Sequence, residues 1–233
     1  MKKTLTDYNR IVHYGCSFTF GQDSGGDGIH DDTLSYPSFL SKLLNNEYIN
    51  KGRMGASNFE ICSKFWMDIY NKNFDNDTAV IANLTSPFRS SYVKKDCNDF
   101  IDPRRDIVIH DKQVRFYLIS PWSNHYTEYR DLHLQQSDLR FYLDTIQAIN
   151  AMQNLSYQYK IPLLILDMHV GTQLQGWKDF FPQFDADKHI IRGDRPYFIE
   201  GGAESSTPSG HFYATGYENI ANKIYKDIKN EKL

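Results

Sequence analysis

Apolar and polar residues follow one another along this chain in blocks that predict strands alternating with helices. Short runs rich in β-branched and aromatic residues predict strands at residues 10–14, 47–50, 78–84 and 163–167. Residues 78–84 are mostly apolar and lie between Asn76-Asp77 and Ser86-Pro87. That pattern is typical of a central strand buried on both faces.

Apolar residues three or four positions apart predict helices between these strands. The helices are expected at residues 36–44, after a cap at Ser57 or Asn58, from about 137 to 159, and from 215 to about 229. Strands that alternate with helices predict a parallel sheet with helices on both faces. We therefore expect an α/β protein, a three-layer α/β/α sandwich whose mainly parallel sheet has about five strands.

Two segments depart from this alternation. Residues 22–32 are polar, rich in glycine and without period, which predicts a mobile surface loop. Residues 90–130 are irregular and are interpreted as an insertion that contains a hairpin at about 106–118. A length of 233 residues suits one domain, so we assign residues 1–233 to a single domain with this insertion.

Composition excludes several classes of function. The 26 lysines and arginines against 29 aspartates and glutamates give a formal net charge of −3, which favours binding to neither nucleic acid nor anionic membranes. The three cysteines, Cys16, Cys62 and Cys97, fit neither a disulfide framework nor a zinc site. No apolar run has the length of a membrane span and no export signal is visible, so we expect a cytoplasmic protein.

The segment Gly15-Cys16-Ser17 places a hydroxyl at the exit of the first predicted strand. A serine on such a turn can present its oxygen at the carboxyl edge of the sheet, where open α/β folds bind ligands. His211 lies in the loop that leads into the last helix and is expected over the same edge. Ser17 is therefore the candidate nucleophile and His211 the candidate base.

An oxyanion needs hydrogen-bond donors at the same edge. The backbone N–H groups of Ser17 and Gly55 and the side-chain amide of Asn83 each lie at or just beyond the end of a predicted strand. Parallel topology alone is enough to bring them together.

These segments, in this order, resemble the sequence blocks of the SGNH, or GDSL-like, hydrolases, which are serine esterases and lipases on a flavodoxin-like α/β/α fold. Residues 15–19 resemble the first block, residues 50–58 the second and residues 210–217 the last. The resemblance implies Ser17 as nucleophile, Gly55 as oxyanion donor and His211 as base. In the third block the Gly-x-Asn-Asp pattern is absent from residues 80–86, so either Asn83 or Thr85 takes the place of its asparagine.

The chain departs from the family where the orienting aspartate should precede the histidine. Those positions hold Pro208 and Ser209, which carry no charge. Either a backbone carbonyl orients His211 or a more distant acid does so, Glu204 or Glu200. We name Glu204 as the candidate.

The remaining candidates are weaker. Arg89 can anchor a substrate carboxylate or phosphate, and Asn58 is a second candidate for substrate binding. The other histidines show no pair with metal-ligand spacing, and the aspartates of residues 22–32 do not match a calcium loop. We expect no metal and no cofactor.

The sequence therefore predicts a serine hydrolase that cleaves an ester, for example a short acyl group on a carbohydrate or another small molecule, through an acyl-enzyme on Ser17. An O-acyltransferase is the close alternative, since only the acceptor of the acyl group differs. A non-catalytic protein of the same fold, which binds a glycan or has a structural role, is the alternative from another class. The sequence leaves the oligomeric state open.

Overall fold

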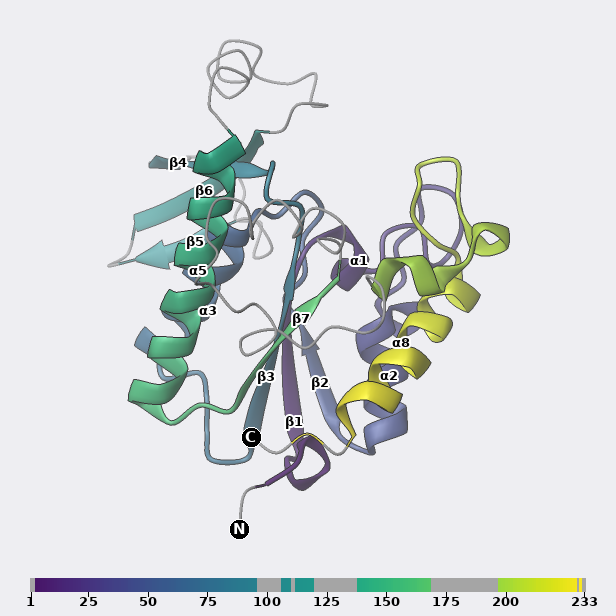
Figure 1. The fold of residues 1–233 in the computed structure, drawn as a ribbon, viewed down its shortest axis with the longest axis horizontal. Helices are drawn as coiled ribbons and strands as arrows, with labels where there is room; N and C mark the ends of the chain where they lie inside the picture. Colours follow the sequence, from purple (N-terminus) through teal and green to yellow (C-terminus); the bar gives the residue numbers. More distant parts are fainter. Residues whose placement is uncertain are drawn as a thin grey trace.

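The computed structural model describes residues 3–95, 106–109, 112–119, 138–168, 197–229 and 231. Its centre is a parallel sheet of four strands in the order β2-β1-β3-β7 (Figure 1). The strands are β1 (Arg10–Tyr14), β2 (Glu47–Asn50), β3 (Thr78–Leu84) and β7 (Leu163–Asp167). All four apolar runs are thus confirmed as strands, whereas the expected number of about five strands is one more than the described residues contribute to this sheet.

Helices cover both faces of this sheet. They are α2 (Tyr36–Leu44), α3 (Asn58–Tyr70), α5 (Asp138–Tyr159) and α8 (Ala214–Ile228). Helices α2 and α8 pack together on one face and α3 and α5 on the other (Figure 1). The expected α/β/α sandwich is therefore confirmed.

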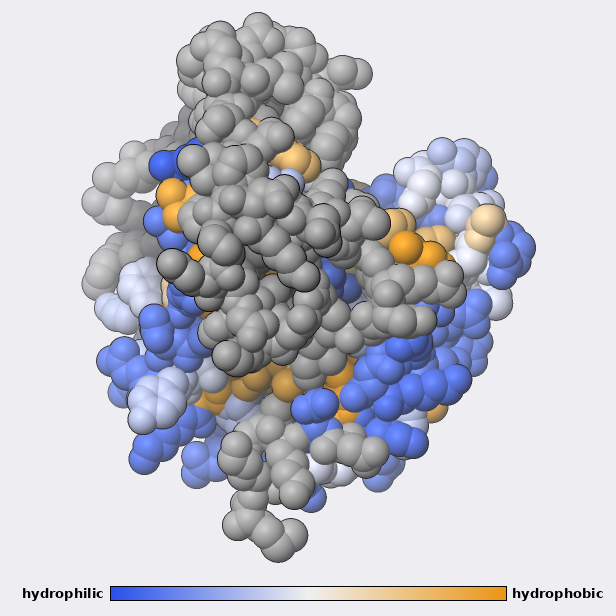
Figure 2. Space-filling view, in the orientation of Figure 1, coloured by the Kyte–Doolittle hydropathy of each residue, from blue (hydrophilic) through white to orange (hydrophobic). Residues whose placement is uncertain are grey.

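The core forms where the sequence pattern places apolar side chains. Every residue of β3 is buried, as expected for the strand between β1 and β7. In α8 the side chains of Ile220, Ile224 and Ile228 are fully buried at spacings of four. The outward surface over α8 is mostly hydrophilic (Figure 2), so this helix is held by one apolar face.

A second sheet, which is antiparallel and has the order β4-β6-β5, lies in the segment where the sequence predicts an insertion. Its strands are β4 (Ser90–Lys95), β5 (Asp106–Ile109) and β6 (Lys112–Ile119). Strands β5 and β6 pair in antiparallel register, which confirms the hairpin expected at 106–118. In the part of the chain that the structure describes, no helix is both long and apolar enough to cross a membrane.

Short helical turns complete the described chain. They are η1 (Leu5–Asp7), α1 (Ser17–Phe20), η2 (Asp32–Leu34), η4 (Tyr197–Gly201) and η5 (Ala203–Ser205).

The loop at residues 22–32 is more buried than its composition predicts. Asp23 and Ser24 are each only 3% exposed. The Ser24 hydroxyl donates to the backbone oxygen of Asp31 at 2.7 Å, and the backbone N–H of Gly28 donates to the Asp23 carboxylate at 3.0 Å. The expectation of a surface loop was wrong for these residues, because their polar groups find partners inside the fold.

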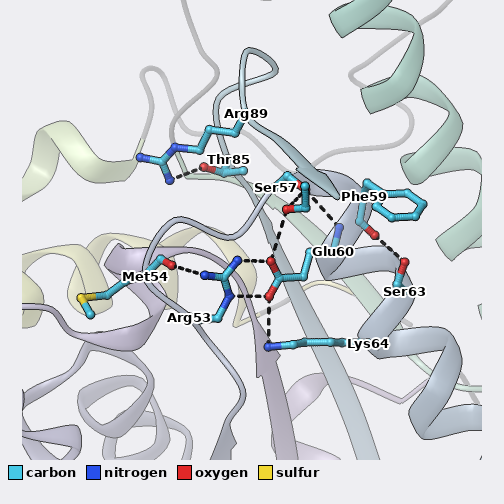
Figure 3. A network of polar contacts seen from close by, with 10 residues as sticks. Arg53, Met54, Ser57, Phe59, Glu60, Ser63, Lys64, Thr85 and Arg89 are labelled. Carbon is cyan, nitrogen blue, oxygen red and sulfur yellow. Dashed lines mark hydrogen bonds and ion pairs between the residues drawn. The ribbon is translucent and has the colours of Figure 1, made fainter. Parts of the chain in front are cut away.

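A buried ion pair fixes the loop between β2 and α3. The Arg53 guanidinium donates to both carboxylate oxygens of Glu60, at 2.6 Å for Nε to Oε1, and also to the backbone oxygen of Met54 (Figure 3). Arg53 is 6% exposed and Glu60 fully buried. The backbone N–H of Arg53 donates to the oxygen of Gly15 at 3.0 Å, so the pair also positions this loop against the turn after β1.

We expect Glu60→Gln to lower the free energy of unfolding by about 3–5 kcal/mol, because the buried Arg53 loses its counter-charge. Urea denaturation measures this loss. Lys64 also depends on this carboxylate, since its Nζ lies 3.2 Å from Oε1 of Glu60. The triple variant Arg53→Met/Glu60→Met/Lys64→Met removes all three charges and should cost less than Glu60→Gln alone. A loss below about 1 kcal/mol for Glu60→Gln would show that the pair does not hold the loop.

Candidate active site

Ser17 begins the four-residue helix α1, directly beyond the end of β1. The turn requires Gly15, because a Cβ at this position would lie 1.9 Å from Oγ1 of Thr19. Helix α1 then ends at Gly21, whose φ of 81° is in the left-handed region. The Ser17 side chain is 2% exposed, and its Oγ has no hydrogen-bond partner among the described residues.

His211 lies beside this turn, although it is far away in the sequence. Its ring centroid is 5.2 Å from that of Phe18, the residue after Ser17. The loop around His211 is held by hydrogen bonds from Thr207 N–H to the His211 oxygen at 2.8 Å and from Tyr213 N–H to the Ser205 oxygen at 2.9 Å. The described chain thus brings both predicted residues to the same edge of the sheet.

The carboxylate behind His211 belongs to Asp23. Its Oδ2 lies 3.9 Å from Nδ1 of His211, and the Ser209 hydroxyl bridges the two groups. Ser209 donates to Oδ2 of Asp23, and its oxygen lies 2.9 Å from Nδ1. Thr207 also donates to Oδ2, at 2.9 Å.

This arrangement selects one tautomer of His211. A serine hydroxyl has a single proton, and that of Ser209 is given to the Asp23 carboxylate. Ser209 can then only accept from Nδ1, so Nδ1 carries the hydrogen and Nε2 keeps its lone pair. A histidine in this state can act as a general base through Nε2.

Electrostatics keep His211 neutral. Burial lowers the pKa of His211, the Asp23 carboxylate raises it, the positive charge of Arg89 lowers it, and the net direction is downward. Burial raises the pKa of Asp23, but hydrogen bonds from Ser209, Thr207 and Gly28 together with the His211 charge outweigh burial and lower it. At neutral pH the pair is therefore a carboxylate and an uncharged imidazole.

Glu204, the acid proposed from the sequence, points elsewhere. It is exposed, and its carboxylate lies beside Gly202, where a Cβ would be 2.5 Å from Oε1 of Glu204. Sequence reasoning missed Asp23 because it follows Ser17 in a loop that looks solvated, and no spacing links it to His211. The one local signal in the sequence was Ser209. Its hydroxyl stands at a position where the SGNH hydrolases, which the sequence resembles, carry the aspartate that orients the histidine.

The candidate oxyanion donors differ in whether their N–H groups already donate hydrogen bonds within the fold. Gly55 has a φ of 73°, and its loop lies against the Ser17 turn through the bond from Arg53 N–H to the Gly15 oxygen. Within the described chain no hydrogen bond from the Gly55 N–H is found. The Asn83 amide is already engaged, since it donates to the Tyr14 oxygen at 3.2 Å and to the Tyr36 hydroxyl.

Thr85 is the alternative to Asn83. Its backbone N–H donates to Oδ1 of Asn58 at 2.8 Å, and its hydroxyl oxygen accepts from Nη1 of Arg89 at 2.9 Å. The Thr85 hydroxyl therefore keeps its own proton for another acceptor. The sequence left either Asn83 or Thr85 as the oxyanion donor. Of the two, Thr85 has a hydroxyl proton that is still available for a hydrogen bond to the oxyanion.

Asn58 has a structural task in the described chain. Besides accepting from Thr85 N–H, its amide donates to the Thr85 oxygen at 3.0 Å and to Oγ1 of Thr145 at 3.1 Å. It therefore ties the end of β3 to α5. These bonds use three of its four hydrogen-bonding positions, which leaves little for a substrate.

Other polar groups near the turn do not form a metal centre. Burial lowers the pKa of His13 to about 3, and its Nδ1 lies 3.5 Å from the Tyr36 hydroxyl, so this histidine stays neutral inside the core. Within the described ranges, no three side chains of His, Cys, Asp or Glu come together as metal ligands.

Comparisons with known proteins identify the fold. No protein-family model and no curated protein match the sequence. Among solved structures, a lipolytic protein of the G-D-S-L family from Desulfitobacterium hafniense DCB-2 is similar at 13% identity, with a TM-score of 0.54 over 94% of this chain and 98% of that one. The psychrotrophic esterase EstA from Pseudoalteromonas sp. is similar at 11% identity, with a TM-score of 0.54 over 95% of this chain and 97% of that one.

A third neighbour is the acetyl xylan esterase Est2A from Butyrivibrio proteoclasticus. It is similar at 13% identity, with a TM-score of 0.53 over 96% of this chain and 64% of that one. Sequence identities this low speak to the fold and not to the reaction. The chain therefore has the fold of the GDSL, or SGNH-like, lipolytic esterases.

Proposed function

We propose that this protein is a serine esterase in which Ser17 is the nucleophile, His211 the base and Asp23 the acid that orients His211 through Ser209. The single observation that carries this proposal is the Asp23–Ser209–His211 arrangement beside the Ser17 turn. It supplies the group that the sequence lacks at Pro208 and Ser209. It also weakens the case for a non-catalytic protein, because a carboxylate is available to orient His211.

The reaction begins when Oγ of Ser17 attacks the ester carbonyl and its proton passes to Nε2 of His211. The positive charge that forms on the imidazolium is stabilised by Asp23 through Ser209. The N–H groups of Ser17 and Gly55 and the Thr85 hydroxyl stabilise the oxyanion. His211 then returns the proton to the departing alcohol, which leaves an acyl group on Ser17.

Hydrolysis of the acyl-enzyme completes the cycle, with His211 again acting first as a base and then as an acid. His211 takes a proton from the water as its oxygen attacks the acyl carbon, and the proton then returns to Oγ of Ser17 as the carboxylic acid leaves. We take water as the acceptor. An O-acyltransferase would differ only in passing the acyl group to another hydroxyl.

We propose a small ester as substrate, with a short acyl group on a carbohydrate as one form of it. The support is the neighbour described as an acetyl xylan esterase, together with the esterases of the same fold. The reaction as proposed needs no metal and no cofactor.

We expect Ser17→Ala to abolish hydrolysis of p-nitrophenyl acetate, because the acyl group loses its acceptor; by analogy with other serine enzymes the loss is about 10⁴-fold or more. A fluorophosphonate probe should label the wild-type protein once, at Ser17, and should not label Ser17→Ala. Peptide mass spectrometry locates the label. Absence of both labelling and hydrolysis in the folded wild type would refute the esterase proposal.

We expect Asp23→Asn to reduce kcat/KM between about tenfold and 10⁴-fold, the upper limit being the effect of an acid in direct contact with its histidine. Because Asp23 raises the pKa of His211, its loss lowers that pKa further. The activity of a base is lost as pH falls through its pKa. The acid limb of the profile, already below the ordinary value of 6.5 in the wild type, should therefore move to lower pH in the variant.

Asp27→Asn is the matched control for this measurement. Asp27 lies in the same loop and is exposed, and it accepts from the Tyr213 hydroxyl at 2.7 Å. Ser209→Ala keeps the carboxylate and removes the bridge, so it should also lose activity. If both test variants are folded by thermal denaturation and remain as active as Asp27→Asn, Asp23 does not orient His211.

A further inference from the structure

Residues 53–56 form the turn that carries Gly55, the proposed oxyanion donor. The N–H of Ala56 donates to the backbone oxygen of Arg53 at 3.1 Å, which closes a four-residue turn. Gly55, its third residue, has a φ of 73°, whereas Met54, its second, is outside the left-handed region. This combination is the mark of a type II turn. A type I turn is the alternative for the same four residues.

The two turn types differ in the direction of one peptide. In a type I turn the second residue has a ψ of about −30° and the third a φ of about −90°, whereas in a type II turn these angles are about +120° and about +80°. Both angles flank the peptide between Met54 and Gly55, so this peptide turns over between the two types. It is trans, and its C=O and N–H therefore point in opposite directions. Whatever holds the Met54 oxygen also sets the direction of the Gly55 N–H.

Arg53 holds the Met54 oxygen from inside the fold. Its Nη1 donates to that oxygen at 2.7 Å, while Nε donates to Oε1 of Glu60 at 2.6 Å and Nη2 to Oε2 (Figure 3). The guanidinium is planar and Glu60 fixes it at two points, so its third nitrogen has a defined direction. The Met54 C=O is thus directed at the buried ion pair, and the Gly55 N–H is directed away from it.

The opposite orientation of this peptide is unfavourable beside Arg53. It would place the Gly55 N–H against the hydrogens of Nη1, so that two donors would face each other. Nη1 would also lose the Met54 oxygen as its acceptor, which is costly for a buried charged group. Arg53 is only 6% exposed, so water is a poor substitute for that acceptor. The ion pair therefore selects one of the two turn types.

We propose that Arg53 is a positioning residue for the oxyanion donor: it keeps the peptide between Met54 and Gly55 in the type II orientation, in which the Gly55 N–H can donate to the oxyanion. This inference rests on the proposed esterase function. Arg53 acts through the peptide whose oxygen it binds, and Glu60 contributes by holding the guanidinium. The donor is thus oriented before the substrate binds, as electrostatic stabilisation of a transition state requires.

Lys64 provides a matched control. Its Nζ lies 3.2 Å from Oε1 of Glu60, and its side chain is 10% exposed, so it pairs with the same carboxylate as Arg53. The hydrogen bond to the Met54 oxygen, however, comes from Arg53. Lys64→Met therefore removes a cation from Glu60 and leaves the contact that orients the peptide.

We expect Arg53→Met to lower kcat for p-nitrophenyl acetate by about tenfold to 10³-fold relative to Lys64→Met, the upper limit being the loss of a whole oxyanion donor. KM should stay the same, because acylation and deacylation each pass through an oxyanion and slow together. The kcat is taken per active site, counted by the end point of fluorophosphonate labelling. Arg53→Lys keeps a cation beside Glu60 with one nitrogen in place of three, so its kcat should be intermediate. This variant carries the test if Arg53→Met does not fold.

A pair of inhibitors separates positioning from a general loss of structure. In a trifluoromethyl ketone the carbonyl carbon accepts Oγ of Ser17, the ketone oxygen becomes an oxyanion, and the serine proton passes to His211. The matching trifluoromethyl alcohol has a similar shape and cannot form this adduct. We expect Arg53→Lys to weaken binding of the ketone by the factor by which kcat falls, and to leave binding of the alcohol unchanged. Equal weakening of both inhibitors would refute the positioning role.

Crystal structures of the wild type, Lys64→Met and the Arg53 variants show the peptide directly, without reference to catalysis. We expect the type II orientation in the first two and a turned peptide, wholly or in part, in the Arg53 variants. If the wild type cleaves no ester and the peptide still turns in these variants, the esterase function fails and the orienting role of Arg53 stands. If the peptide keeps its orientation in every folded Arg53 variant, or if those variants are as active as Lys64→Met, Arg53 does not position the donor.

Discussion

The buried carboxylate of Asp23 is the group on which the rest of the candidate site depends. It is 3% exposed, and a charge in that position is stable only when hydrogen bonds replace water. The donors come from the hydroxyls of Thr207 and Ser209 and from the N–H of Gly28. Satisfying Asp23 therefore fixes the His211 loop against the Ser17 turn, across more than 180 residues of sequence. The Ser209 hydroxyl that helps to stabilise the Asp23 charge is also the group that links Asp23 to His211 in the proposed site.

The other half of the site depends on a second buried charge. Glu60 is satisfied by Arg53, and the N–H of Arg53 reaches back to the oxygen of Gly15. Gly15 has no room for a side chain against Thr19, so the turn that carries Ser17 requires glycine at this position. One buried carboxylate thus orients the proposed base through Ser209, and another positions the proposed oxyanion loop. Asp23 follows α1 and Gly15 precedes it, so these contacts lie on either side of a helix too short to be stable alone.

The sequence predicted what depends on local pattern and failed where distant residues meet. The four strand runs and the isoleucines at every fourth position of α8 are local patterns, which identify these elements without reference to distant residues. Ser17 and His211 could be found because each lies at the end of an element in a parallel sheet. Asp23 could not, because its partners come from the other end of the chain. Asn83 looked available at a strand end, yet the buried hydroxyl of Tyr36, from α2, accepts from its amide. The residues of these two contacts lie far apart in the chain at no characteristic spacing, so a single sequence does not reveal them.

Asp23 and Arg89 act on the pKa of His211 in opposite directions. Asp23 raises the pKa of the imidazole, whereas Arg89 lowers it, together with burial. Burial and Arg89 favour the neutral imidazole that can accept the Ser17 proton, whereas Asp23 favours the imidazolium that forms once the proton has moved. The proposed base thus has support in both of its protonation states, each from a different part of the fold.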